Sequence, residues 1–122
     1  MEEWTVERHL EGHPREFVDL YHRFIDVVSA VGPFEYAVAK SAITLTGTRR
    51  GFAGAKLDSK GLKGYLDLQR AIEGDPRILR AEPYTKRLFV HHFRITDPSQ
   101  FDDEFAGWVR EAYAVGQGAH LT

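Results

Sequence analysis

Hydrophobic residues recur every three or four positions near both ends of the chain and every second position between them. The first helical spacing predicts a long amphipathic helix whose apolar stripe is Phe17, Leu20, Tyr21, Phe24, Ile25, Val28 and Val31. Pro14 suits the start of this helix, because it has no N–H to lose there, and Gly32-Pro33 ends it. A shorter helical piece precedes it, with Thr5 as N-cap and Gly12 as its end.

Alternation with a period of two predicts β-strands in the middle of the chain. Six strands are expected, at residues 34–38, 43–46, 52–57, 62–68, 78–82 and 88–95. The third and fourth strands form a hairpin around Asp58-Ser-Lys-Gly61. Pro83 places the end of the fifth strand at a sheet edge or in a turn, because proline cannot donate a ladder hydrogen bond.

The segment Asp97-Pro98-Ser99-Gln100 predicts the start of the last helix. Asp97 is the expected N-cap, Pro98 occupies the first helical position, and Gln100 falls where a capping box places Glu or Gln. The buried stripe of this helix is expected to be Phe101, Phe105, Trp108, Val109 and Ala112. Gly116 closes the helix, and a loose tail is expected from about residue 117.

These elements together predict an α+β fold in one domain, residues 1–122. Its expected parts are N-terminal helices, an antiparallel meander of about six strands, and a C-terminal helix packed on one face of the sheet. Short loops and the lack of long crossovers argue against a parallel sheet. A chain of 122 residues is long enough to form a core without a disulfide or a metal.

Composition narrows the classes of partner. The chain has no cysteine, which excludes disulfides, thiolate zinc sites, iron–sulfur clusters and a cysteine nucleophile, and fits a cytoplasmic location. No apolar run approaches the ~20 residues that span a bilayer, so no membrane partner is expected. The net charge of −2 does not favour a nucleic-acid partner, which would need a local basic patch.

Two adjacent histidines lie in the last expected strand. Neighbouring side chains of a strand point to opposite faces, so His91 shares a face with Phe89, Phe93 and Ile95, while His92 shares one with Arg94. The pair is therefore poorly placed to bind one metal ion together, and a metal site would need ligands from elsewhere in the chain. A core position for His91, with either a pKa lowered by desolvation or a carboxylate or carbonyl partner, is favoured over catalysis, and His92 is expected to be the more exposed.

Cationic residues accumulate along the expected strands. Lys40 and Arg49-Arg50 bracket the second strand, and further Lys and Arg follow at positions 56, 60, 63, 80, 86, 87 and 94. An open sheet face that gathers several of them would suit a phosphate or a carboxylate. A solvated, charge-balanced surface is the competing and more usual explanation for such residues.

Known catalytic and metal-binding templates are missing from the sequence. It contains neither a Walker phosphate-binding loop nor a G-x-S-x-G motif. His9 and His13 have the helical spacing of a zinc pair, but Gly12 and Pro14 break the helix that would align them. No metal and no cofactor are therefore expected.

Six short motifs are spread in order over nearly the whole chain. They are Thr5-Val-Glu7, Gly32-Pro33, Lys40-Ser-Ala-Ile43, Phe52-Ala-Gly54, the strand from Val90 to Ile95, and the stretch from Asp102 to Tyr113. With these motifs the chain resembles the family catalogued as domain of unknown function 5655, some members of which are labelled "predicted transport protein". The resemblance implies a small stand-alone α+β domain and no established chemistry, substrate or cofactor. It draws attention to Lys40, Phe52, Gly54, His91 and Arg94.

Three functional hypotheses remain. The favoured one is a binding module for an anionic small molecule or a nucleic-acid backbone, with Lys40, Arg50, Phe52, His91, His92 and Arg94 as ligand-binding residues. The alternative is a structural or interaction protein, for example a homodimer that pairs edge strands or exposed Trp4 and Tyr84. An enzyme is the least favoured, because His91 as general base needs a carboxylate that only Glu35 or Glu82 could supply.

Overall fold

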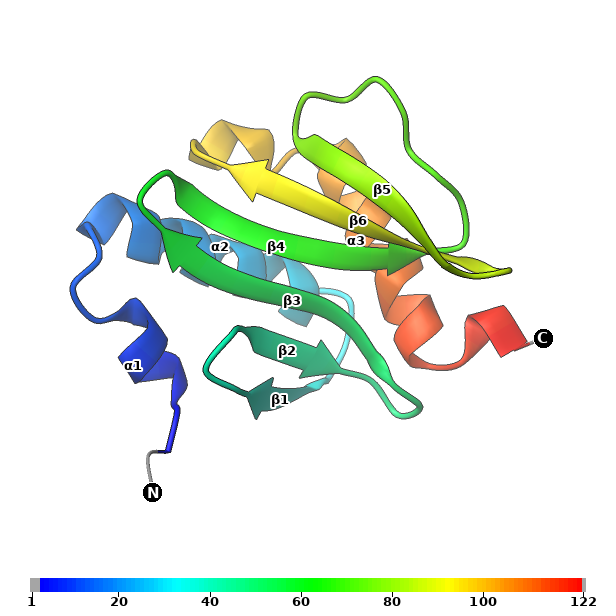
Figure 1. Cartoon of the computed structure of the whole chain (residues 1–122), viewed down its shortest axis with the longest axis horizontal. Helices are drawn as coiled ribbons and strands as arrows, with labels where there is room; N and C mark the ends of the chain where they lie inside the picture. The colour runs from blue at the N-terminus through cyan, green and yellow to red at the C-terminus, as the bar shows by residue number, and fades with distance from the viewer. Residues whose placement is uncertain (1–2, 122) are drawn as a thin grey trace.

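A computed structural model describes residues 3–121 of the chain. Figure 1 shows two layers, with the helices α2 (Arg15–Ser29) and α3 (Asp103–Gly116) behind a six-stranded sheet. The strands are β1 (Glu35–Val38), β2 (Ile43–Thr46), β3 (Gly51–Asp58), β4 (Gly61–Leu68), β5 (Ile78–Thr85) and β6 (Leu88–Ile95). All paired strands are antiparallel. The predicted α+β fold with a C-terminal helix on one face of the sheet is confirmed.

The strand order is β1-β2-β3-β4-β6-β5, so the sheet follows a plain meander only as far as β4. Both β4 and β5 are antiparallel to β6, and the segment between Leu68 and Ile78 therefore returns along the length of the sheet. β6 lies between β4 and the edge strand β5, and three of its four fully buried side chains, His91, Phe93 and Ile95, share one face of the strand. β5 contains Pro83 and lies at the edge of the sheet. Proline is tolerated there because an edge strand needs to donate hydrogen bonds to only one neighbouring strand.

The hydrophobic core fills the space between the sheet and the helices α2 and α3. Phe24 of α2, Phe93 of β6 and Phe105 of α3 form an aromatic cluster with ring centroids 5.3–6.3 Å apart, and all three are fully buried. Burial of one such side chain contributes roughly 2–3 kcal/mol to folding. The helical stripes and the alternation of the strands therefore meet in one core.

A β-bulge in β3 changes which face Phe52 occupies. Leu45 of β2 pairs with Ala53, whereas the next residue, Thr46, pairs with Gly51, so Phe52 is an extra residue in the strand. Phe52 and Ala53 are both fully buried. The Phe52 ring packs edge-on against Tyr113 of α3, with centroids 5.4 Å apart. Phe52 therefore belongs to the core rather than to a ligand-binding surface.

The last helix begins later than predicted. Asp97 and Gln100 do form a capping box, but it closes a 3-10 turn, η1 (Pro98–Gln100). Phe101 then leaves the helical conformation, and its ring packs against Phe105 with centroids 5.2 Å apart. The helix α3 starts afresh with Asp102 as its N-cap, which accepts a hydrogen bond from the Phe105 N–H.

Two short helices complete the chain at its ends. The first, α1 (Val6–Leu10), is capped by Thr5 as expected, and Nε2 of its His9 lies 2.6 Å from the Ala39 carbonyl oxygen. The second is a 3-10 turn, η2 (Ala119–Leu121), where the sequence alone predicts only a loose tail. There the His120 carbonyl accepts a hydrogen bond from the Arg87 guanidinium.

Arg77 anchors the segment between β4 and β5 to the start of α3. Its buried guanidinium donates hydrogen bonds to Asp75, Asp102 and Glu104, at 2.7–3.0 Å, and lies 4.6 Å from the centre of the Trp108 ring. The hydrogen bonds and charges of Asp75 and Asp102 raise the pKa of Arg77 further above its ordinary value. The acidic residues at the start of α3 are thus engaged in a structural contact.

Candidate functional site

His91 lies on the helix-covered face and is fully buried. Its Nδ1 donates to the Phe89 carbonyl oxygen at 3.1 Å, and its Nε2 accepts a hydrogen bond from the Ile72 N–H at 3.0 Å. These two contacts fix a neutral ring, and desolvation lowers the pKa of His91 accordingly. Because both ring nitrogens are engaged with backbone groups, His91 serves to hold the β4–β5 segment against the sheet.

His92 lies on the opposite, open face of the same strand. Its Nε2 is 3.1 Å from a carboxylate oxygen of Glu82, and the same oxygen accepts a hydrogen bond from Arg80 Nε at 2.6 Å. Partial burial and the neighbouring Arg80 charge lower the pKa of His92. Of the two carboxylates considered for His91, Glu82 therefore reaches the other histidine.

The two predicted site arginines, Arg50 and Arg94, also lie on the open face, but each has an acidic partner. Arg50 Nη2 is 2.8 Å from Asp67, and Arg94 forms two hydrogen bonds of 2.7 Å to the carboxylate of Asp58. The Arg94 pair holds the pKa of Asp58 far below its usual range. Lys40 is exposed in the turn between β1 and β2. The structure thus groups Arg50, His92 and Arg94 on one face but leaves Lys40, Phe52 and His91 elsewhere.

A pair of lysines that sequence reasoning did not select lies on the open face near the β3–β4 hairpin. The strand register places Lys56 directly opposite Lys63, and Lys63 directly opposite Arg94. Neither lysine side chain forms a hydrogen bond or a salt bridge with any residue from 3 to 121, although the charge of Lys63 helps to lower the pKa of Asp58. Alternation along β3 and β4, with the hairpin at Asp58-Ser-Lys-Gly61, could have identified this pair.

The first of three depressions on this side of the molecule lies around the two lysines. It has a volume of about 200 Å³ and is lined by Lys56, Lys63, Tyr65, Arg80 and His92, with Gly54 and Gly64 in its floor. The Tyr65 ring packs so closely over Gly54 that a Cβ there would overlap it. A larger residue at position 54 would therefore displace the Tyr65 ring.

The second depression, of about 320 Å³, adjoins the first and shares Tyr65 and His92 with it. Its other lining residues include Asp67 and Tyr84. Asp67 is only 4% exposed, and its Oδ1 has no hydrogen-bond partner among residues 3–121. Burial raises the pKa of Asp67 to about 6, because the loss of solvation outweighs the attraction of Arg50.

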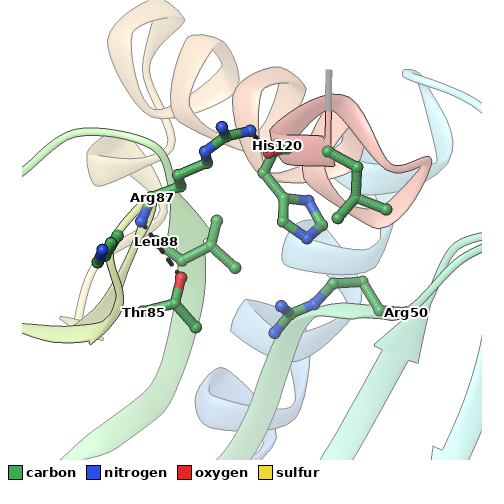
Figure 2. A pocket seen from close by; sticks show the side chains of 7 residues that line it. Arg50, Thr85, Arg87, Leu88 and His120 are labelled. Atoms are coloured by element: carbon green, nitrogen blue, oxygen red, sulfur yellow. Dashed lines mark hydrogen bonds between the residues drawn. The ribbon is translucent and has the colours of Figure 1, made fainter.

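The third depression, of about 440 Å³, lies between the β5–β6 turn and η2 (Figure 2). The residues that line it are Arg50, Thr85, Lys86, Arg87, Leu88, His120 and Leu121. Figure 2 shows the Arg50 guanidinium and the His120 ring directed into the same space, opposite Thr85 and Leu88. The depression therefore combines basic side chains with an apolar wall.

Charge is unevenly distributed between the sheet and the rest of the molecule. Residues 49–95 contain 11 of the 16 Lys and Arg and 5 of the 18 Asp and Glu, which gives this segment a net charge of +6. The remaining residues contain 5 and 13, respectively, a net charge of −8. The overall charge of −2 thus conceals a basic sheet segment and acidic flanking segments.

The structure defines a two-layer α+β domain with one helix-covered and one open face of its sheet. A family model matches residues 6–116, and the chain belongs to that family, described as "Domain of unknown function (DUF5655)". No curated protein and no solved structure matches the chain. Within residues 3–121, no helix is both long and apolar enough to cross a membrane, and no group of three or more acidic or histidine side chains is arranged to hold a metal ion.

Proposed function

We propose that this chain is a binding module for an anionic ligand and that the ligand lies on the open face of the sheet. The observation that carries the proposal is the cross-strand pair of Lys56 and Lys63, which forms no salt bridge among residues 3–121 and lines a depression of about 200 Å³. Like charges directly opposite each other destabilise a sheet. A bound anion would relieve this repulsion.

The neighbouring residues suit a phosphate or a carboxylate. The two ammonium groups provide point charges, and Arg80 and His92 line the same depression from the far side. Arg80 and Arg94 already form ion pairs with the carboxylates of Glu82 and Asp58, respectively. The lysines are therefore expected to contribute most of the charge attraction, and the arginines mainly the shape of the site.

Binding is favoured over catalysis because the predicted general base, His91, does not lie in the site. His91 is buried on the other face, and both of its ring nitrogens bond to backbone groups. His92 lies in the depression, but its carboxylate partner Glu82 is shared with Arg80. A binding role requires neither histidine to exchange a proton.

The proposal is tested by titrating inorganic phosphate, pyrophosphate and tripolyphosphate into the protein by calorimetry, at low and moderate salt. Affinity is expected to rise with anion charge and to fall as salt is added. In the variant Lys56→Gln/Lys63→Gln, affinity is expected to fall at least about tenfold, which corresponds to about 1.4 kcal/mol.

A matched control removes two positive charges from the other side of the molecule. The variant Arg15→Gln/Arg23→Gln changes exposed residues of α2 and is expected to bind as the original protein does. An equal loss in both double variants would show that only net charge matters and would overturn the proposed site. The absence of any anion binding would overturn the proposed function itself.

A homodimer is a second candidate because β1 forms an open sheet edge. This strand has no proline, and Tyr36 within it is 48% exposed. A second copy could pair its own β1 with this edge. Light scattering after size exclusion tests this candidate: a dimer that dissociates in a Tyr36→Lys variant would support it, and a monomer at high protein concentration would refute it.

A further inference from the structure

We propose that the anionic ligand of the open face is a single-stranded nucleic acid, whose bases stack on Tyr65 and Tyr84 and whose phosphates lie at the two basic ends of the face. This inference rests on the proposed function, since it uses the same lysine pair. It goes further by naming the chemical class of the ligand and by including the two depressions that a small anion would leave empty.

The three depressions are linked in a row by shared lining residues, and together they are called the track. Tyr65 and His92 line both the first and the second depression, and Arg50 lines both the second and the third. Along β4, Lys63 and Asp67 are four residues apart, a distance of ~13 Å at the usual strand rise. A track of this length, which continues past Asp67 to Lys86, exceeds the size of a single phosphate group.

Aromatic side chains occupy the middle of the track. Tyr65 packs against Gly54, and its ring lines both the first and the second depression. Tyr84 is 65% exposed, and the Arg50 guanidinium lies 5.6 Å from the centre of its ring. Nucleobases stack on such rings whatever their identity, because every base has a π-face.

Cationic side chains occupy both ends of the track. Lys56 and Lys63 lie at one end, and Arg50, Lys86 and Arg87 at the other. A stacking middle between basic ends is the arrangement with which proteins bind single strands without sequence preference. The net charge of +6 on residues 49–95 would attract a polyanion to this face. The acidic helices on the other side of the sheet would repel it.

The acidic groups of the open face lie between these ends rather than at them. The Asp67 carboxylate is almost fully enclosed and paired with Arg50, and Glu82 is paired with Arg80 and His92. Phosphates placed over this middle region would be repelled by the carboxylates, whereas the uncharged bases would not be. The charge pattern therefore favours a strand whose bases, and not its phosphates, cover the centre of the track.

Fluorescence anisotropy with a labelled oligothymidylate of about 12 nucleotides, within the usual range for such sites, tests the inference directly. The oligonucleotide is expected to bind more tightly than tripolyphosphate, and more tightly than a duplex of the same length, whose bases are stacked inside. The variants Tyr65→Leu and Tyr84→Leu are each expected to weaken oligonucleotide binding about tenfold and to leave tripolyphosphate binding unchanged.

Two further variants separate a specific track from general charge attraction. Tyr36→Leu removes an exposed tyrosine of β1 that lies outside the track, and it is expected to have no effect on binding. Lys86→Gln is expected to lower the salt dependence of oligonucleotide binding by about 0.7 in the slope of log K against log salt, as for one lost phosphate contact. It is expected to leave tripolyphosphate binding unchanged.

The outcomes distinguish the two proposals. If tripolyphosphate binds but the oligonucleotide binds no more tightly, or the Tyr65→Leu and Tyr84→Leu variants bind it normally, the nucleic-acid inference fails and the proposed function stands. If the duplex binds as well as the single strand, the stacking inference fails. If neither anion binds, both fail. Should Tyr65→Leu not fold, as checked by circular dichroism, Tyr84→Leu decides, because Tyr84 is largely exposed.

Discussion

The two faces of the sheet differ in what they do with polar groups, and the neighbouring residues His91 and His92 show the difference. His91 is fully buried, and backbone groups bond to both of its ring nitrogens. His92 lies on the open face beside a shared carboxylate and two depressions. One face of β6 is thus committed to stability, while the other retains side chains available to a ligand.

The open face also carries interactions that do not favour folding. Lys56 and Lys63 face each other, and Asp67 keeps one buried oxygen unpartnered among residues 3–121. Polar groups buried without partners cost free energy. Such groups concentrate where a protein sacrifices stability for function. Substitutions on the two faces are therefore expected to have opposite signs or very different sizes.

The largest effect is expected for Phe93→Ala on the covered face. Phe93 contacts the rings of Phe24 and Phe105 and is fully buried, so its truncation should leave a cavity and lower the free energy of unfolding by about 3–5 kcal/mol. Urea denaturation measures the change. Val90→Ala, on the open face of the same strand, is the control and should cost less than about 1 kcal/mol. Equal costs would remove the distinction between the faces.

His91→Leu is expected to lower the free energy of unfolding by about 2–3 kcal/mol, because it leaves the buried Ile72 N–H and the Phe89 carbonyl without their partner. Urea denaturation again gives the magnitude, and hydrogen exchange at the Ile72 amide should accelerate. The matched variant His92→Leu removes an imidazole from the opposite face and should change stability by less than about 1 kcal/mol. A larger cost for His92→Leu would contradict the structural role assigned to His91.

The separation of these histidines could be predicted from the sequence, because the period of two in β6 is a local property of the chain. The helical stripes and the edge position of Pro83 were predictable for the same reason. The insertion of β6 between β4 and β5 was not, since β6 pairs with β4 and not only with its neighbour in sequence, and such a long-range pairing cannot be inferred from local spacing. The bulge at Phe52 and the interruption at Phe101 likewise follow from packing against α3 and within the core.

The candidate site was predicted only in part. Arg50, His92 and Arg94 do lie on the open face, but the ion pairs of the two arginines with Asp67 and Asp58 join residues 17 and 36 positions apart. Such partners cannot be inferred from local spacing. The lysine pair was within reach of the sequence, because it follows from the hairpin register alone. The accumulation of Lys and Arg along the strands could be seen in the sequence, but which of these side chains lack a salt bridge could not.

Asp67→Asn is expected to have an effect that depends on pH. The pKa of Asp67 is raised to about 6 in the folded protein, so the folded state binds the proton more tightly than the unfolded state does. The contribution of Asp67 to stability is therefore greatest below about pH 4 and is lost as the pH rises through 6. Asparagine does not ionise and escapes this loss.

The free energy of unfolding of Asp67→Asn, relative to the original protein, should therefore rise by about 1–3 kcal/mol between pH 4 and pH 7.5. Urea denaturation of both proteins at the two pH values measures this difference, in which all other titrating groups cancel. Asp58→Asn is the contrasting variant, because Arg94 lowers the pKa of Asp58 and its contribution is present at neutral pH and lost in acid. A pH-independent difference for Asp67→Asn would show that Asp67 ionises normally.

The smallest effect is expected for Lys56→Gln, and its sign is informative. Removing one of two directly opposed lysines should raise the free energy of unfolding by a few tenths of a kcal/mol at low salt, and the gain should vanish at high salt because exposed charges are screened. Lys40→Gln, in the β1–β2 turn, is the control and should show no such gain. A loss of stability in Lys56→Gln would mean that the lysine is a favourable part of the folded sheet. A gain would mean that the two opposed lysines destabilise the folded sheet. Their presence would then be explained by binding of an anionic ligand rather than by folding.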